Sequence, residues 1–183
     1  MLAHFHSTAT LIAVGGVLVL CACGTATSSV ASQGKDTLSL AGRDTSGSSA
    51  AMAKRASLDS VCVDAINGYR STLSLAALKD WSDSLDCFDR QAALDDAGNV
   101  AHSNFGMCGE MAQNTCPDWT TDTTLAAESK TLKSCILQMW NEGPGTDYSA
   151  HGHYINMTNK SYTKVGCGLH LQGTAAWIDM DFR

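Results

Sequence analysis

Six cysteines that all follow residue 57 constrain the fold of this chain more than any other feature. They are Cys62, Cys87, Cys108, Cys116, Cys135 and Cys167. None forms a CxxC pair, which argues against a zinc–thiolate site. An even set in an exported chain is typical of a disulfide framework, although six cysteines can pair in many ways. We expect three disulfides: Cys108–Cys116 across a short loop, then Cys62–Cys87 and Cys135–Cys167, each joining a helix to another element.

The N-terminal residues are typical of an exported protein. Leu11–Ala22 is an apolar stretch of 12 residues. It is too short to span a bilayer as a helix, since that takes about 20 apolar residues, but its length suits the core of a signal peptide. The residues before it contain no Lys or Arg, so the α-amino group and the histidines His4 and His6 supply the positive charge there. We therefore expect a signal peptide over residues 1–23.

The end of this segment, Leu20-Cys21-Ala22-Cys23, resembles a bacterial lipobox. On this interpretation Cys23 becomes the lipidated first residue of the mature protein, and the membrane is a partner through that anchor. The alternative is ordinary signal cleavage nearby, with Cys23 removed or left free. The protein would then be secreted instead of anchored in the bacterial cell envelope.

Residues 24–56 are rich in Ser, Thr, Ala and Gly and contain few large apolar side chains. Such a segment buries too little apolar surface to offset the entropy lost on ordering it. We expect a flexible linker over residues 24–56 and one domain over residues 57–183, because that length suits a single domain. The formal net charge of −6 leaves no basic patch for phosphates, which argues against a nucleic-acid partner.

Apolar side chains recur at helical spacing in three segments of the domain, and the C-terminal residues change to an alternating pattern. We expect helices over residues 58–74, 82–97 and 123–141. The alternation on either side of Gln172-Gly173-Thr174 predicts a β-hairpin of strands 165–171 and 178–182, and an earlier strand is expected over 151–157. Helices first and strands last favour an α+β fold with an antiparallel sheet covered by helices.

Six short motifs follow one another along the domain. In chain order they are Asn67-Gly68-Tyr69-Arg70, Ala101-His102-Ser103, Cys108-Gly109-Glu110, Met139-Trp140-Asn141-Glu142, Gly152-His153-Tyr154 and Val165-Gly166-Cys167-Gly168. This ordered set resembles the CAP superfamily, or SCP domains, which includes cysteine-rich secretory proteins, venom antigens and plant pathogenesis-related proteins. The resemblance covers nearly all of residues 58–183.

The resemblance implies an α-β-α sandwich with a central antiparallel sheet and a cleft lined by two histidines and two glutamates. Carried over residue by residue, these are His102, Glu110, His153 and Glu142. Glu142 stands one residue nearer the tryptophan than the family pattern has it, because Gly143 occupies the usual position.

The chemistry of these side chains allows a metal site independently of the family. Two neutral imidazoles, from His102 and His153, and one or two carboxylates are reasonable ligands for zinc or another divalent cation. On a strand, His151 and His153 would point to the same face, so His151 is a possible further ligand. The alternative is that each histidine is a hydrogen-bonded, partly exposed residue without a metal.

Three classes of function fit such a domain. The first is a non-enzymatic extracytoplasmic module that binds a small-molecule, lipid or protein ligand in the cleft. The second is a hydrolase, either metal-assisted near Glu110 or using Ser103, although Ser103 directly follows His102 and neighbours in sequence seldom face each other. The third, suggested only by analogy with some relatives, is a lipid- or sterol-binding protein. We expect the first.

Overall fold

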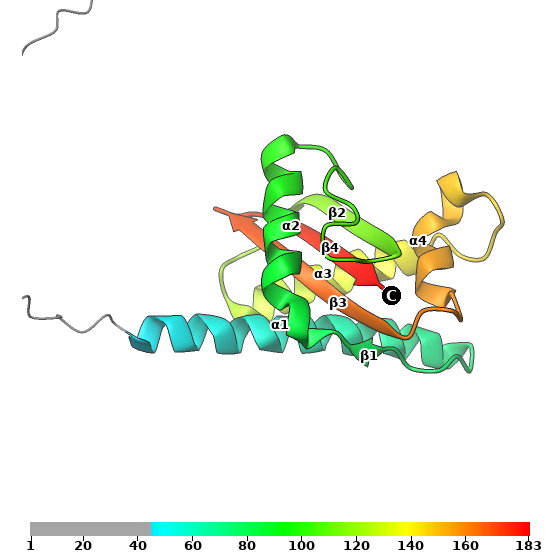
Figure 1. Ribbon diagram of the computed structural model, residues 1–183, viewed down its shortest axis with the longest axis horizontal. Helices are drawn as coiled ribbons and strands as arrows, with labels where there is room; N and C mark the ends of the chain where they lie inside the picture. Colours follow the sequence, from blue (N-terminus) through cyan, green and yellow to red (C-terminus); the bar gives the residue numbers. More distant parts are fainter. Residues whose placement is uncertain (1–44) are drawn as a thin grey trace, which may run out of the picture. The chain divides into compact units, whose positions relative to one another are not determined.

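A four-stranded sheet in the order β1-β3-β4-β2 forms the middle layer of the computed structural model, which describes residues 45–183 (Figure 1). The strands are β1 (Lys79–Asp80), β2 (Ala112–Thr120), β3 (Lys164–Gln172) and β4 (Ala175–Phe182). β3, β4 and β2 are antiparallel, as expected, whereas the two-residue β1 runs parallel to β3. The expected hairpin is confirmed, since β3 and β4 are joined at Gly173-Thr174.

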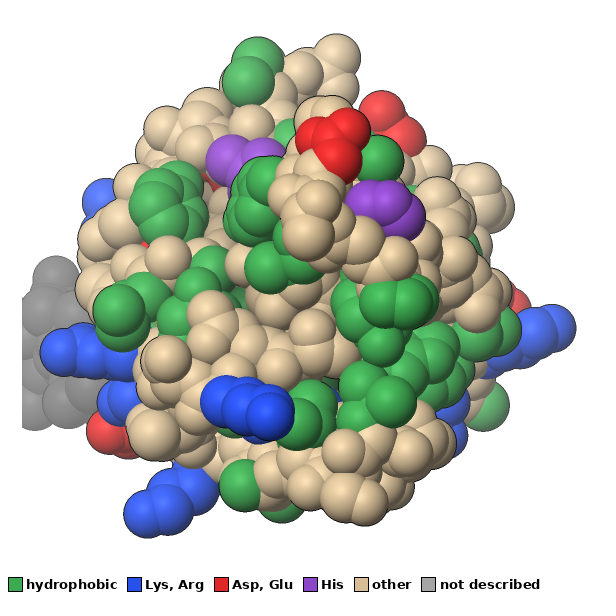
Figure 2. All heavy atoms as spheres, turned by 90° about the vertical axis from the view of Figure 1, so that its right-hand side faces the viewer, with side chains coloured by type: hydrophobic (Ala, Val, Ile, Leu, Met, Phe, Trp, Pro, Cys, Tyr) green, Lys and Arg blue, Asp and Glu red, His purple; other side chains and the backbone are tan. Residues whose placement is uncertain are grey.

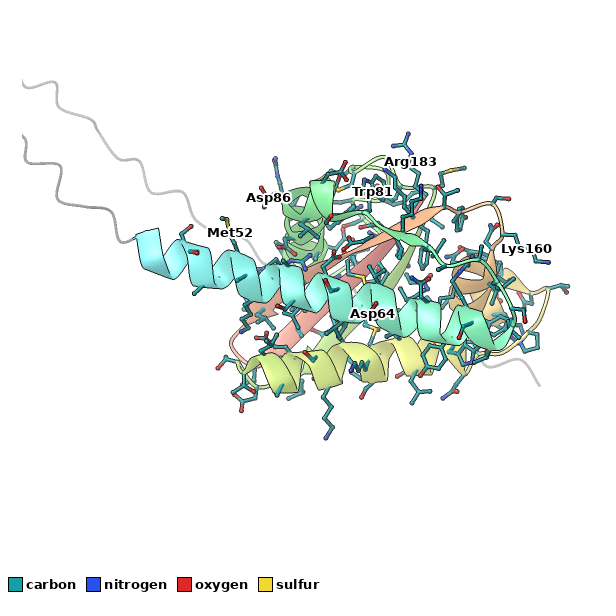
Figure 3. The ribbon with its side chains drawn as sticks, turned by 90° about the horizontal axis from the view of Figure 1, so that it is seen from below. Met52, Asp64, Trp81, Asp86, Lys160 and Arg183 are labelled. Carbon is teal, nitrogen blue, oxygen red and sulfur yellow. A yellow bond between two sulfur atoms is a disulfide. The ribbon has the colours of Figure 1, made fainter. Side chains whose placement is uncertain are left out.

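Helices cover both faces of this sheet and give the expected α+β sandwich. The helices are α1 (Thr45–Thr72), the short 3₁₀ helix η1 (Ser82–Ser84), α2 (Leu85–Gly98), α3 (Leu125–Trp140) and α4 (Tyr148–Thr158). α2 packs on one face, and α1 and α3 lie side by side on the other (Figure 3).

The two faces of the sheet differ in polarity. On β4, Ile178 and Met180 belong to the apolar core shared with α1 and α3. The alternate residues Asp179 and Asp181 pair with Gly168 and Gly166 of β3, which face α2. This explains the Val-Gly-Cys-Gly motif, because a Cβ at either glycine would collide with Phe88 of α2. The motif therefore lets α2 close on the sheet above a polar layer.

Three disulfides are present within residues 45–183, but the expected pairing is wrong. The bonds are Cys62–Cys167, Cys87–Cys108 and Cys116–Cys135. Cys116 faces the core below the sheet, where α3 supplies Cys135, so Cys108 pairs with α2 instead. The prediction rested on loop length alone, but the side chains of Cys108 and Cys116 lie in different layers of the fold.

Two further expectations are corrected. Residues 151–157 are not a strand but part of α4, whose start is capped by Asp147 accepting a hydrogen bond from the Ser149 N–H at 3.0 Å. Residues 45–56, assigned to the linker, are helical and belong to α1. The expected signal peptide, Cys23 and the rest of the linker lie outside the described residues.

No helix within residues 45–183 combines the length and apolar character needed to cross a membrane.

Candidate functional site: a histidine-lined polar cleft

A cavity of about 210 Å³ lies between α4 and the start of β2. It is lined by His102, Gln113, Glu142, Tyr148, Ser149, Gly152, His153 and Asn156. Histidine side chains reach the surface on the side of the molecule that carries α4 (Figure 2). The structure thus brings three of the four expected residues, His102, Glu142 and His153, to one cavity.

Glu142 holds His153 from just beyond the end of α3. Glu142 Oε1 is hydrogen-bonded to His153 Nδ1, and Oε2 accepts from the backbone N–H of His153 at 3.0 Å and of Tyr154 at 3.3 Å. Both carboxylate oxygens are therefore used within the protein. The free ring nitrogen of His153, Nε2, has no hydrogen-bond partner among the described residues.

His102 enters the cleft from the loop between α2 and β2. Its backbone has φ 64°, in the left-handed region that a non-glycine residue rarely adopts. Its Nδ1 lies 2.8 Å from Gln113 Oε1 and 3.2 Å from Thr115 Oγ1, both on β2. As with His153, Nδ1 is engaged by the protein and Nε2 is the ring nitrogen that remains.

Two buried carboxylates hold the loop that carries His102. Asp95 Oδ1 accepts from Ser103 Oγ at 2.7 Å and from the Asn104 backbone N–H at 2.8 Å. Glu110 accepts from the backbone N–H groups of Gly106 and Cys108 and from the Gln91 amide. Glu110, expected in the cleft, is thus buried in this loop and does not line the cavity.

His151 also lies outside the cavity lining. On helix α4 it does not share a face with His153, and its Nδ1 lies 2.8 Å from the Glu142 carbonyl oxygen and 3.1 Å from that of Gly143. These hydrogen bonds join His151 of α4 to the segment that connects α3 and α4.

The polar layer under α2 carries buried carboxyl groups close to this site. Asp179 and Asp181 have no exposed surface and take part in no ion pair among the described residues. Burial, together with the charges of Asp95 and Glu110, raises the pKa of Asp179 to about 7. Burial and the charges of Glu110 and Asp179 raise the pKa of Asp181 to about 9.

The cleft offers fewer free protein ligands than a catalytic zinc site has. A catalytic zinc site uses three protein ligands, whereas here two imidazole Nε2 atoms are free and both oxygens of Glu142 accept hydrogen bonds within the protein. Within residues 45–183, no group of three or more His, Cys, Asp or Glu side chains is arranged to hold a metal ion.

The two serine hydroxyl groups nearby donate hydrogen bonds to carboxylates. Ser103 Oγ donates to Asp95, and Ser149 Oγ, which lines the cleft, donates to Asp147 Oδ1 at 2.8 Å. Among the described residues neither serine donates a hydrogen bond to a histidine, so neither forms the Ser–His pair that commonly activates a serine nucleophile.

Comparison with protein families identifies the domain. The model of the cysteine-rich secretory protein family, CAP, matches residues 63–176, more than half of the chain. The chain belongs to the CAP family. Its three disulfides fit the oxidising, exported environment in which CAP proteins are typically found.

Two solved structures are similar to this CAP domain. The crystal structure of Na-ASP-1 is 16% identical with a TM-score of 0.48, and the match covers 69% of this chain and 38% of that one. The crystal structure of NaASP2 with Zn²⁺ is 17% identical with a TM-score of 0.47, and the match covers 67% of this chain and 77% of that one. Comparison with curated proteins gives no significant match.

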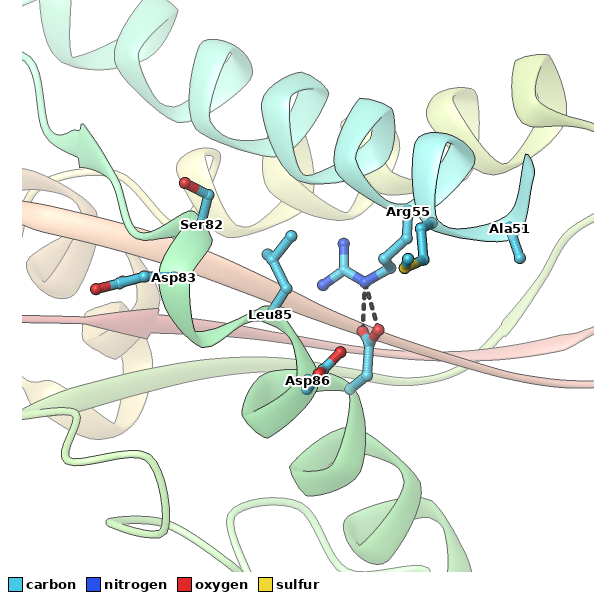
Figure 4. Close-up of a pocket in the computed structure, with 8 residues that line it drawn as sticks. Ala51, Arg55, Ser82, Asp83, Leu85 and Asp86 are labelled. Atoms are coloured by element: carbon cyan, nitrogen blue, oxygen red, sulfur yellow. Dashed lines mark hydrogen bonds and ion pairs between the residues drawn. The ribbon is translucent and has the colours of Figure 1, made fainter. Parts of the chain in front are cut away.

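Another cavity of the CAP domain, about 450 Å³, lies between α1 and the start of α2 (Figure 4). It contains an ion pair in which Arg55 Nε lies 2.5 and 2.6 Å from the carboxylate oxygens of Asp89. Arg55 also donates to the Cys167 carbonyl, and Asp89 accepts from the Leu169 N–H at 2.9 Å. These groups tie α1, α2 and β3 together, so Arg55 and Asp89 have structural partners.

Sequence reasoning missed the cleft residues on β2 and α4, chiefly Gln113, Tyr148 and Ser149. β2 was not expected at all, because its alternate residues Gln113 and Thr115 face the polar layer and break the apolar signal of a strand. The Asp147-x-Ser149 capping pattern was the available signal for α4.

Proposed function

We propose that this CAP domain is a non-enzymatic binding module whose ligand contacts His102 and His153 in the cleft. The observation that carries the proposal is that both histidines line one cavity and use Nδ1 within the protein, while Nε2 has no hydrogen-bond partner among the described residues. The serines around the cleft are held by carboxylates, which supports binding over nucleophilic catalysis.

The lining indicates the kind of ligand. The 210 Å³ cavity is bounded mainly by polar side chains, so it suits a small polar group. A second cavity of about 200 Å³ shares Glu142 and His153 and is lined also by Pro117, Trp119 and Met139. A ligand that fills both would place an apolar part against Trp119. The polar first cavity gives no support to a lipid or sterol as the main occupant.

An NMR screen tests the proposal. The protein, labelled with ¹⁵N, is titrated with a panel of small sugars, amines and dipeptides, and shifts are mapped. We expect binders to move the backbone signals of Gly152 and His153, and a His102→Ala, His153→Ala double variant to lose the response. Binders that act equally on the double variant would place the site elsewhere.

Metal-assisted hydrolysis is the second candidate, because two imidazoles do share one cavity. Neither serine near the cleft supports a metal-free route. Metal analysis of the purified protein decides between the classes. Stoichiometric zinc that disappears in His102→Ala would favour the hydrolase.

We further propose that the protein is exported and anchored by lipid on Cys23. The support is the apolar Leu11–Ala22 segment and the Leu20-Cys21-Ala22-Cys23 sequence. Because one acyl chain binds a bilayer only marginally, firm anchoring takes at least two. Mass spectrometry of the mature N-terminus tests this, and an unmodified terminus at another residue would contradict it.

A further inference from the structure

Gln113 connects the cleft to the buried layer behind it. Its Oε1 lies 2.8 Å from His102 Nδ1, and its Nε2 donates to Asp181 Oδ1 at 3.1 Å. Gln113 is 5% exposed and Asp181 is fully buried. The three side chains form a continuous hydrogen-bonded chain from the cleft into the sheet.

The orientation of the Gln113 amide sets the direction of these bonds. The amide nitrogen can only donate, and it donates to the carboxyl group of Asp181; the amide oxygen can only accept. The hydrogen in the bond to His102 therefore sits on Nδ1. Thr115 Oγ1 supports this orientation, since it also donates to Gln113 Oε1, at 3.4 Å.

This direction determines what His102 offers to the cleft. A neutral imidazole with its hydrogen on Nδ1 keeps the lone pair on Nε2. A neutral imidazole with its hydrogen on Nε2 would instead present a donor. The buried Gln113 amide thus selects between two tautomers, one with an acceptor at Nε2 and one with a donor there.

We propose that Gln113 is a positioning residue of the cleft, which holds His102 as the Nδ1–H tautomer and presents the Nε2 lone pair to the ligand. Glu142 holds His153 as the same tautomer, because its carboxylate accepts the hydrogen bond from His153 Nδ1. The ligand class that fits two lone pairs is a hydrogen-bond donor, such as an amine or hydroxyl compound, or a cation. This last step rests on the proposed function, whereas the tautomer is a property of the ligand-free protein.

This buried chain of hydrogen-bonded side chains also costs free energy of folding. The second oxygen of Asp181, Oδ2, has no hydrogen-bond partner among residues 45–183. A buried polar group without a partner destabilises the fold, and apolar residues at these positions would avoid that cost. Packing alone therefore does not explain these polar side chains, whereas a role in positioning His102 does.

Histidine-ring NMR of the ligand-free protein tests the proposal. Spectra that correlate ring nitrogens with ring protons are recorded about two pH units above 6.5, the ordinary histidine pKa, so that the rings are neutral. Comparison with His102→Ala assigns the signals. We expect the His102 hydrogen on Nδ1 in the wild type and in Thr123→Val, a control at an exposed residue outside the cleft lining.

Gln113→Leu removes the acceptor, and we expect the protonated-nitrogen shift to move from Nδ1 to Nε2. The double variant Gln113→Glu, Asp181→Asn keeps an acceptor for His102 Nδ1 and keeps the bond between residues 113 and 181 with its direction reversed, because the asparagine amide now donates to the glutamate, so it should restore the Nδ1–H tautomer. A wild-type His102 with its hydrogen on Nε2, or an unchanged tautomer in Gln113→Leu, would overturn the proposal. Because no ligand is present, either result leaves the binding function to be judged separately.

Discussion

Glu110 Oε2 accepts a hydrogen bond at 2.9 Å from the backbone N–H of Cys108, two residues earlier in the chain. Its other oxygen accepts from the Gly106 N–H and the Gln91 amide. The glutamate that the family resemblance placed in the cleft therefore closes the loop that carries His102. Glu110 therefore affects the cleft by holding in place the loop that carries His102.

Glu110→Gln should destabilise the domain by about 1–3 kcal/mol, because the new amide NH₂ faces a backbone donor and leaves it unpaired. Urea unfolding, monitored by tryptophan fluorescence, measures the change. Asp83→Asn, at an exposed residue, is the control and should change the free energy of unfolding by less than about 0.5 kcal/mol. Equal effects of the two substitutions would show that Glu110 does not hold the loop.

The domain should lose stability as the pH rises from about 4 to about 9. Burial raises the pKa of Asp179 to about 7 and of Asp181 to about 9 in the folded state, from 3.8. Between these values the folded protein binds more protons than the unfolded chain, so the free energy of unfolding falls with increasing pH. Asp59, whose pKa burial raises to about 7, acts in the same direction. Urea unfolding at several pH values in this range measures the slope.

Asp181→Asn separates this effect from other titrations. The asparagine oxygen can still accept from Gln113 Nε2 but does not ionise, so the variant should be more stable than wild type near pH 9 and show a shallower slope. Asp64→Asn, at an exposed residue on α1 (Figure 3), should leave the slope unchanged. A wild-type stability that increases over this pH range would contradict the account.

The Cys62–Cys167 disulfide should contribute most among the three. It closes a loop with a sequence separation of 105, against 21 for Cys87–Cys108 and 19 for Cys116–Cys135. Loop entropy predicts about 4.7 kcal/mol for the long loop and about 3 kcal/mol for each short one. Double Cys→Ala variants compared by urea unfolding test the order. A larger loss on removing Cys87–Cys108 would reject it, and peptide mapping without reductant checks the pairing.

Arg70→Lys should cost about 2–3 kcal/mol. The buried guanidinium donates to three backbone carbonyls, those of Ala76 at 3.0 Å, Met157 at 2.7 Å and Asn159 at 3.1 Å, and so joins α1 to the end of α4. A lysine ammonium cannot reproduce this planar fork. The exposed Arg90→Lys serves as the control. Indistinguishable unfolding curves for the two variants would refute the role of Arg70.

The sequence predicted the elements whose apolar pattern is regular, and the failures have physical causes. α3 and the β3–β4 hairpin have regular apolar patterns and were expected, and α2 was expected from Phe88 and Ala92 although it also buries Gln91 and Asp95. β2 was missed because Gln113 and Thr115 face a polar layer, and α4 was taken for a strand because its buried residues include Asn156. The motifs located His102 and His153. The side chain of Glu110 points into its own loop because backbone N–H groups there donate to it, and no sequence motif indicates those contacts.

The central claim is that His102 and His153 present free Nε2 atoms to one cleft. A titration with Zn²⁺, used as a probe for imidazole lone pairs and followed by histidine-ring NMR above pH 6.5, the ordinary pKa of histidine, tests this most directly. We predict that the two rings respond along a single saturation curve, that His151 does not follow it, and that His102→Ala weakens the response of His153. Independent curves for the two rings, or an unaltered His153 response in His102→Ala, would contradict a shared site.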